Sequence, residues 1–184
     1  MALLRKLSWR LRREDGFGLI ELLAAMLMLN IGIIALVTAF SSGQVALRRA
    51  GKIATAASLA DRQMEGYRAI KYDLIKLDST SLASTDATYV NDSSYGADGT
   101  YTGDVDTSKN AITVTCTSPV PDYCNPSRLA TGADGKSYRV DTYVTENPVT
   151  SGRNVRRVTV VVRDATSLGT VLARQSSDFD QSTG

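Results

Sequence analysis

The chain has 184 residues, of which 43 % are hydrophobic, so its size fits one modest domain plus an apolar segment and excludes a large multi-domain enzyme. It contains no histidine, the commonest acid–base residue and metal ligand at neutral pH, which disfavours hydrolytic and zinc chemistry. The formal net charge of +2 is unevenly distributed, because five basic side chains precede Gly16 and the remainder carries 16 basic and 17 acidic side chains. Residues 17–184 therefore lack the basic surface that is typical of nucleic-acid binding.

Residues 17–40 form an almost unbroken apolar run in which Glu21 is the only ionisable side chain. As a helix at about 1.5 Å per residue, the run would be roughly 36 Å long, which is enough to cross a bilayer. A removable secretory signal has a shorter apolar core of about 7–15 residues, so we expect cleavage before this run rather than after it. Residues 1–16, which carry five basic side chains, then form a leader at the cytoplasmic end of a membrane helix.

Glu21 is the informative residue of this helix, because a carboxylate in a membrane-spanning segment costs about 2.5–3.5 kcal/mol. The apolar run contains no Lys or Arg to pair with it. Cleavage between Gly16 and Phe17 would create a new amino terminus four residues away. That cation would neutralise the carboxylate within one subunit, or pair with it between neighbouring subunits and fix their axial stagger. The alternative is that Glu21 lies at headgroup level and needs no partner.

The sequence of residues 15–23, DGFGLIELL, resembles the leader junction of type IV pilins and type II secretion pseudopilins. This resemblance implies that a prepilin peptidase cleaves after Gly16 and methylates the new amino-terminal Phe17. It also implies that Glu21 sets the registry between subunits. Gly18 departs from the Thr or Ser that is common at its position, which leaves the cleavage prediction intact and slightly weakens the start of the helix.

The middle of the apolar run, LNIGIIAL, is similar to the corresponding segment of PilV-like minor pilins and minor pseudopilins. Its two distinctive residues are Asn30 and Gly32. Packing between helices, through a small residue and an interhelical amide bond, accounts for both residues without any family-specific role.

Residues 41–77 are predicted to continue the helix as an amphipathic segment, with loosening near Ser41–Gly43 and at Gly51. Apolar side chains recur there at steps of three and four, which is helical periodicity. Because an uncovered stripe would remain exposed, we expect this half to pack against a globular head. The stripe consists of Ile53, Ala56, Ala60, Met64, Tyr67, Ile70 or Lys71, and Leu74.

Residues 78–184 are predicted to form the head. Its first part, residues 79–110, is polar and rich in turn residues, and we expect a long irregular connection in which Asp92, Asp98, Asp104 and Asp106 lie in solvated turns. Period-two alternation then predicts strands over residues 112–117, 138–145 and 157–163, and a last strand that begins near Val171. Sequential hairpins would make an antiparallel meander that covers the Met64–Tyr67–Leu74 side of the helix. The expected class is therefore α+β.

Two further groups of head residues remain open to two interpretations each. Cys116 and Cys124 lie on the side that would be exported, so they form either a disulfide or a pair of buried thiols, and their spacing matches no metal site. A basic cluster forms either a solvated strand face or a docking patch for a neighbouring subunit. Its members are Arg153, Arg156, Arg157 and Arg163.

The sequence thus predicts a structural subunit, a minor pilin of a type IV pilus-like filament, and not an enzyme, because no nucleophile–base pair, phosphate loop or metal cluster is visible. It predicts no cofactor. The expected partners are other pilin subunits, the prepilin peptidase, an inner-membrane assembly platform and the membrane, and no nucleic acid. The expected location is the bacterial cytoplasmic membrane, with the head outside, and then an extracellular pilus. The alternatives are a type II secretion pseudopilin and a signal-anchored surface binding protein that never polymerises.

Overall fold

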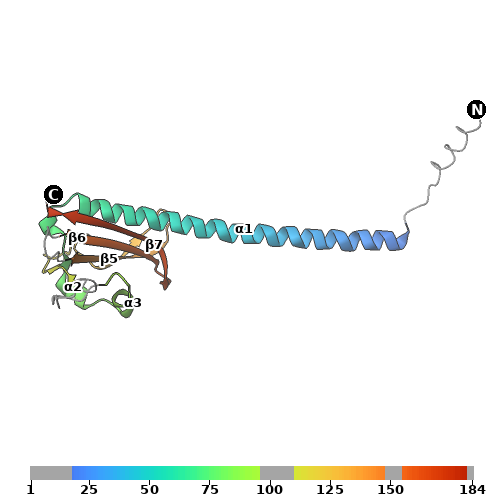
Figure 1. Cartoon of the computed structure of the whole chain (residues 1–184). Coiled ribbons are helices and arrows are strands. Elements are labelled where there is room, and N and C mark those ends of the chain that lie inside the picture. The colour runs from blue at the N-terminus through green and yellow to red at the C-terminus, as the bar shows by residue number, and fades with distance from the viewer. Residues whose placement is uncertain (1–17, 96–109, 148–154, 182–184) are drawn as a thin grey trace, which may run out of the picture. The chain divides into compact units, whose positions relative to one another are not determined.

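The computed structural model describes residues 18–95, 110–147 and 155–181 of the chain (Figure 1). Two compact units divide the sequence, residues 1–48 and residues 49–184. The described elements are a long N-terminal apolar helix and a mainly antiparallel sheet, which confirms the predicted α+β class.

Helix α1, Leu19–Arg68, shows no interruption at Ser41–Gly43 or at Gly51, where the sequence predicts loosening. The hydroxyl groups in this region bond to the backbone of their own helix. Ser41 Oγ donates to the carbonyl oxygen of Val37 and Ser42 Oγ to that of Ala39, each at 2.9 Å. Because these hydroxyls are satisfied inside the helix, they do not require the chain to turn towards other partners.

Within residues 49–184, the predicted apolar stripe of α1 is buried at its centre. Ala56, Ala60, Met64 and Tyr67 are at most 2 % exposed, whereas Ile53 is 42 % exposed. The buried side chains pack with the valines and tyrosines of the sheet into one core cluster. This part of the helix therefore packs against the head as its periodicity predicts.

The end of α1 differs from the prediction, because the helix stops at Arg68 rather than near residue 77. A 3₁₀-helix, η1 (Tyr72–Leu74), follows and leaves Leu74 half exposed, so the prediction that Leu74 faces the sheet is wrong. Arg156 holds this segment. Its Nη1 donates to the carbonyl oxygen of Tyr72 at 2.6 Å, and its guanidinium lies 4.3 Å from the Tyr72 ring centroid. These tertiary contacts stabilise the turn that follows α1.

The main sheet has five strands and contains the predicted meander. Strands β5 (Ser137–Asn147), β6 (Val155–Asp164) and β7 (Ser167–Asp180) pair antiparallel in sequence order. The short strands β2 (Asn110–Ala111) and β4 (Ser127–Thr131) both pair with β5. The predicted strand over residues 112–117 is reduced to β3 (Thr113–Val114), which pairs in parallel with β1 (Leu77–Asp78).

Both faces of β5 are buried, so the sheet is the middle layer of the head. The face with Val140 and Val144 lies against α1, and the opposite face carries Asp141 and Tyr143, which are also buried. The second cover consists of α2 (Ser79–Ala83) and α3 (Ala87–Val90), on the side of the sheet away from α1 (Figure 1). The alternation of β5 therefore separates two buried environments rather than a buried and a solvated one.

The two short helices correct the prediction that residues 79–110 are irregular throughout. Asp78 caps α2 by accepting from the backbone N–H of Ser81, and Asp86 caps α3 by accepting from that of Tyr89. Aspartate before a helix is a strong capping signal, and it was present in the sequence. The expectations for Asp98, Asp104 and Asp106 lie outside the described residues.

The turn between β4 and β5 depends on two glycines. Gly135 has a φ of 73°, a left-handed conformation that favours glycine. Gly132 approaches α1 so closely that an added Cβ would lie 2.7 Å from Tyr138 Cε2 and would also collide with Thr55 Cγ2. Gly132 therefore permits the close contact between the start of β5 and α1.

Candidate functional site

Only part of the predicted processing site falls within the described residues. Gly16 and Phe17, the predicted cleavage and methylation positions, lie outside them. Glu21 is exposed in the first turn of α1, where its backbone N–H donates to the carbonyl oxygen of Gly18 at 2.9 Å. A carboxylate at this position interacts favourably with the helix dipole. In the parts of the chain that the structure describes, no cation forms an ion pair with Glu21.

The apolar side chains that follow Glu21 are exposed around the whole circumference of α1. This helix is long and apolar enough to cross a membrane, and the most apolar part of it is entirely unburied. Exposed apolar area of this extent is unfavourable in water, so lipid or other protein must cover it. The one amide within this run, Asn30, is exposed as well. In membrane proteins, side-chain amides of this kind hydrogen-bond to partners on other helices.

Cys116 and Cys124 form a disulfide in the head, with their Cα atoms 6.8 Å apart. Asp78, which precedes α2, forms hydrogen bonds to both cysteines, at the two ends of the loop that the disulfide closes. Its Oδ1 accepts from the Cys116 N–H at 3.0 Å, and its own N–H donates to the Cys124 carbonyl oxygen at 2.7 Å. The bonds from Cys116 and then from Ser81 lower the pKa of the Asp78 carboxyl. The disulfide loop is thus held by a carboxylate that also caps α2.

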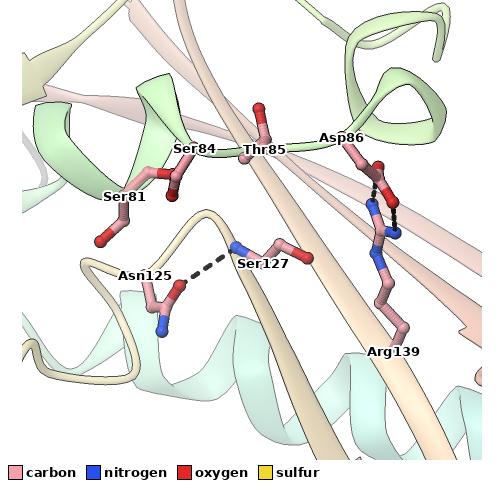
Figure 2. A pocket seen from close by; sticks show the side chains of 7 residues that line it. All are labelled: Ser81, Ser84, Thr85, Asp86, Asn125, Ser127 and Arg139. Carbon is pink, nitrogen blue, oxygen red and sulfur yellow. Dashed lines mark hydrogen bonds and ion pairs between the residues drawn. The ribbon is translucent and has the colours of Figure 1, made fainter.

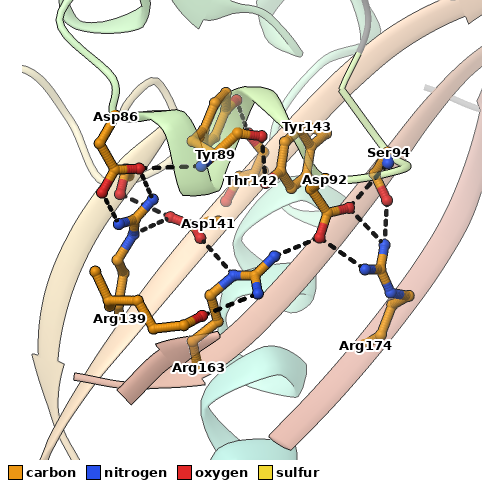
Figure 3. A network of polar contacts seen from close by, with 12 residues as sticks. Asp86, Tyr89, Asp92, Ser94, Arg139, Asp141, Thr142, Tyr143, Arg163 and Arg174 are labelled. Carbon is orange, nitrogen blue, oxygen red and sulfur yellow. Dashed lines mark hydrogen bonds and ion pairs between the residues drawn. The ribbon is translucent and has the colours of Figure 1, made fainter. Parts of the chain in front are cut away.

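A chain of alternating carboxylates and guanidinium groups joins the second cover layer to the sheet (Figure 3). At its centre lies Asp141 on β5, which is fully buried. Asp141 accepts from Arg139 Nε at 2.7 Å, from Arg163 Nε at 3.1 Å and from Ser127 Oγ at 2.7 Å. A buried carboxylate with three donors is paired and hydrogen-bonded as burial of a charge requires.

Each arginine of this network continues to a carboxylate of the cover layer. Arg139 forms a two-pronged ion pair with Asp86, with Nη2 and Oδ1 2.8 Å apart, and Arg163 pairs with Asp92. Arg174 on β7 completes the network by donating from Nη2 to Asp92 at 2.8 Å. Three carboxylates face three guanidinium groups, so the network is electrically balanced.

These contacts correct two predictions. Asp92 is not in a solvated turn, because its side chain is only 3 % exposed and pairs with two arginines. In the basic cluster, Arg156 and Arg163 do not lie on a solvated strand face. Arg163 and Arg156 are buried with partners, and Arg157 is half exposed in an ion pair with Asp178 in which Nε and Oδ1 are 2.7 Å apart. Arg153 lies outside the described residues.

Next to the network lies a polar hollow of about 400 Å³ (Figure 2). Its lining comes from two parts of the head that are distant in sequence. One part is α2 and the segment after it, with Ser81, Ser84, Thr85 and Asp86. The other is formed by the sheet side, with Asn125, Ser127 and Arg139. Asp86, Ser127 and Arg139 belong to both the hollow and the network, so the hollow has a fixed wall.

The charges and hydroxyls of the hollow are already engaged with the protein. The hydrogen bond from Arg139 lowers the pKa of Asp86 to about 2, so this carboxyl is ionised and paired at neutral pH. No group of three or more His, Cys, Asp and Glu side chains in residues 18–95, 110–147 and 155–181 is placed to hold a metal ion. The arrangement offers hydrogen bonds to a ligand rather than a reactive group.

The hollow and the network are the features of the candidate site that the sequence alone did not predict. The available signal was the pair of capping aspartates followed by a single Asp92, opposite strands that carry Arg139 and Arg163. Comparison of the chain with protein-family models, curated proteins and solved structures returns no match.

Proposed function

We propose that this chain is a pilin-like structural subunit, specifically a minor pilin, which is anchored in the cytoplasmic membrane by α1 and assembles into a type IV pilus-like filament. The observation that carries the proposal is the junction DGFGLIELL, whose last five residues begin a helix that exposes its apolar side chains on all sides up to residue 50. Such a helix suits both lipid and the interior of a bundle of identical helices. It can therefore pass from the membrane into a filament without changing its own structure.

Glu21 supplies the specific contact in this proposal. Cleavage after Gly16 gives Phe17 a charged amino group, and methylation keeps that charge. In the filament the Glu21 carboxylate of one subunit meets the amino group of a neighbouring Phe17. The pairing removes an unpaired charge from an apolar environment, which would otherwise disfavour assembly.

Two measurements test the proposal. Mass spectrometry of the mature protein should show an amino terminus at Phe17 with one added methyl group. Glu21→Ala should reduce incorporation into filaments at least tenfold, since loss of about 1.4 kcal/mol or more corresponds to that factor. Glu65→Ala is the matched control, because Glu65 is an exposed glutamate of the same helix whose partner is the nearby Arg68. Normal incorporation of Glu21→Ala would contradict the filament proposal.

A type II secretion pseudopilin would share the same processing and the same Glu21 contact, so the two assignments differ in the machine and not in the chemistry. Deletion separates them: loss of surface pili with intact protein export supports the pilus. A signal-anchored binding protein is the remaining alternative, and the polar hollow in the head is compatible with it as well as with a pilin. That alternative predicts a protein that keeps residues 1–16 and never polymerises.

A further inference from the structure

The polar hollow of the head differs from an ordinary surface depression because all of its lining residues carry hydrogen-bonding side chains. Its volume of about 400 Å³ lies within the range of about 300–1,000 Å³ that is usual for small-molecule sites. Such sites are normally lined mainly by apolar groups, and this one is not. A ligand that displaces water from it must therefore mainly replace the hydrogen bonds of that water.

The pairing of the charges in the lining disfavours an ionic ligand. Asp86 is neutralised by its two-pronged pair with Arg139. All three guanidinium nitrogens of Arg139 donate to carboxylates, Nε to Asp141 and the other two to Asp86. An anion would meet the Asp86 carboxylate without a free cation, and a cation would meet a carboxylate whose charge is already balanced.

The hydroxyl groups of the lining are oriented as acceptors. Ser81 donates its proton to Asp78 and Ser127 donates to Asp141, both at 2.7 Å. Ser84 and Thr85 donate to backbone carbonyl oxygens at 2.8 Å. Because each hydroxyl carries one proton and two lone pairs, all four oxygens keep lone pairs for a ligand.

Asn125 adds the complementary donor. Its side-chain oxygen accepts from the Ser127 N–H at 3.2 Å, and its NH₂ group has no partner among residues 18–95, 110–147 and 155–181. The hollow thus presents several acceptors and a donor in a charge-balanced setting. Hydroxyl groups on neighbouring carbons match this pattern, because each of them both donates and accepts.

We propose that this hollow binds a neutral saccharide of one or two rings. The site uses Ser84, Thr85 and Asn125 for direct hydrogen bonds, and the paired Asp86 and Arg139 as its fixed wall. Since the lining residues are all polar or charged, affinity for a single sugar should lie at about the millimolar level. This function is independent of filament assembly and would serve either a pilin or a surface-anchored binding protein.

The test is saturation-transfer NMR on the full chain in a detergent that has no sugar headgroup. Glucose, glucosamine and glucuronic acid form a matched series, because the three share one ring and differ in charge. Galactose, N-acetylglucosamine and lactose extend the neutral set. We expect signals from at least one neutral sugar, and weaker or no signals from the charged pair.

Variants then locate the binding. Ser84→Ala and Asn125→Ala should each weaken binding of the responding sugar about three- to tenfold, the effect of one lost hydrogen bond. Ser58→Ala is the matched control, since Ser58 makes the same type of bond to a backbone carbonyl, at 3.1 Å to Thr55, but lies on α1 away from the hollow. It should bind as the parent chain does. Ser84 is exposed, so its replacement leaves folding intact and the result interpretable.

Three outcomes would overturn the proposal: no neutral sugar gives a signal, a charged member of the series binds more tightly than glucose, or both hollow variants bind with unchanged affinity. None of these outcomes affects the processing at Gly16 or the role of Glu21. Failure of the saccharide site and failure of the filament proposal are therefore distinguishable.

Discussion

Replacing Asp141 by asparagine removes the central charge of the buried network and should strongly destabilise the head. Asp141 is fully buried and holds the guanidinium groups of Arg139 and Arg163 together with the Ser127 hydroxyl. Removing one partner of a buried ion pair costs about 3–5 kcal/mol. Asparagine keeps one acceptor oxygen, and both arginines keep their outer carboxylates, so we expect the lower end, about 3 kcal/mol. For a head of this size, that is a fall in Tm of roughly 10 °C.

The matched control is Asp178→Asn, because Asp178 accepts from an arginine Nε at the same 2.7 Å but is half exposed. An exposed pair contributes about 0–1 kcal/mol, so its Tm should fall by less than about 3 °C. Near-UV circular dichroism is a suitable assay, since Tyr143 beside Asp141 stacks on Tyr89 at 4.4 Å between ring centroids. Equal losses in the two variants would refute the reasoning that burial, and not ion-pair geometry, determines the cost.

Three further predictions concern the head. Gly132→Ala should destabilise the head by about 1–3 kcal/mol, because the added methyl group overpacks the contact with α1. Gly66→Ala should stabilise it by up to about 1 kcal/mol, because an added Cβ on α1 meets open space and alanine favours the helix. Urea denaturation measures the free energy of unfolding of both variants. Replacing Cys116 and Cys124 together by alanine should cost about 2–2.5 kcal/mol, from loop-closure entropy over a separation of 8 residues, in the same assay. The pKa of Asp86 in the folded head is about 2, below its value of about 3.9 in the unfolded chain. The ionised carboxylate therefore stabilises the folded head at neutral pH, and this contribution is lost as the pH falls from about 4 to 2. Asp86→Asn should accordingly have a lower Tm than the parent chain at pH 7 and a smaller fall in Tm between about pH 4 and pH 2.

The meander could be predicted from sequence because its strands carry a local signal. Val158, Val160 and Val162 alternate with other residues, and each strand is bounded by turn residues. The helical stripe of Met64 and Tyr67 is local in the same sense. These elements follow from periods of two and of three to four residues, which a short window of sequence contains.

The second buried face of the sheet could not be predicted in this way. Arg139 and Asp141 occupy the positions that a half-solvated strand would give to polar residues, and nothing nearby in sequence covers them. The cover of this face comes from the segment that carries Asp86 and Asp92. Asp86 is 53 residues from its partner Arg139, and Asp92 is 71 residues from its partner Arg163. An alternating strand with a solvated face and one with a polar buried face have the same local pattern. Only the tertiary arrangement separates them.

The same arrangement explains why a polar hollow can have a rigid lining. Helix α3 is one turn long and buries only Tyr89, so the ion pairs of the flanking Asp86 and Asp92 also attach it to the sheet. Asp141 binds both Arg139 and Ser127, which also line the hollow. The carboxylate that holds the cover layer therefore also orients the lining. Asp141→Asn should therefore lose saccharide binding even at temperatures where its head is still folded. Asp178→Asn should keep both its stability and its saccharide binding.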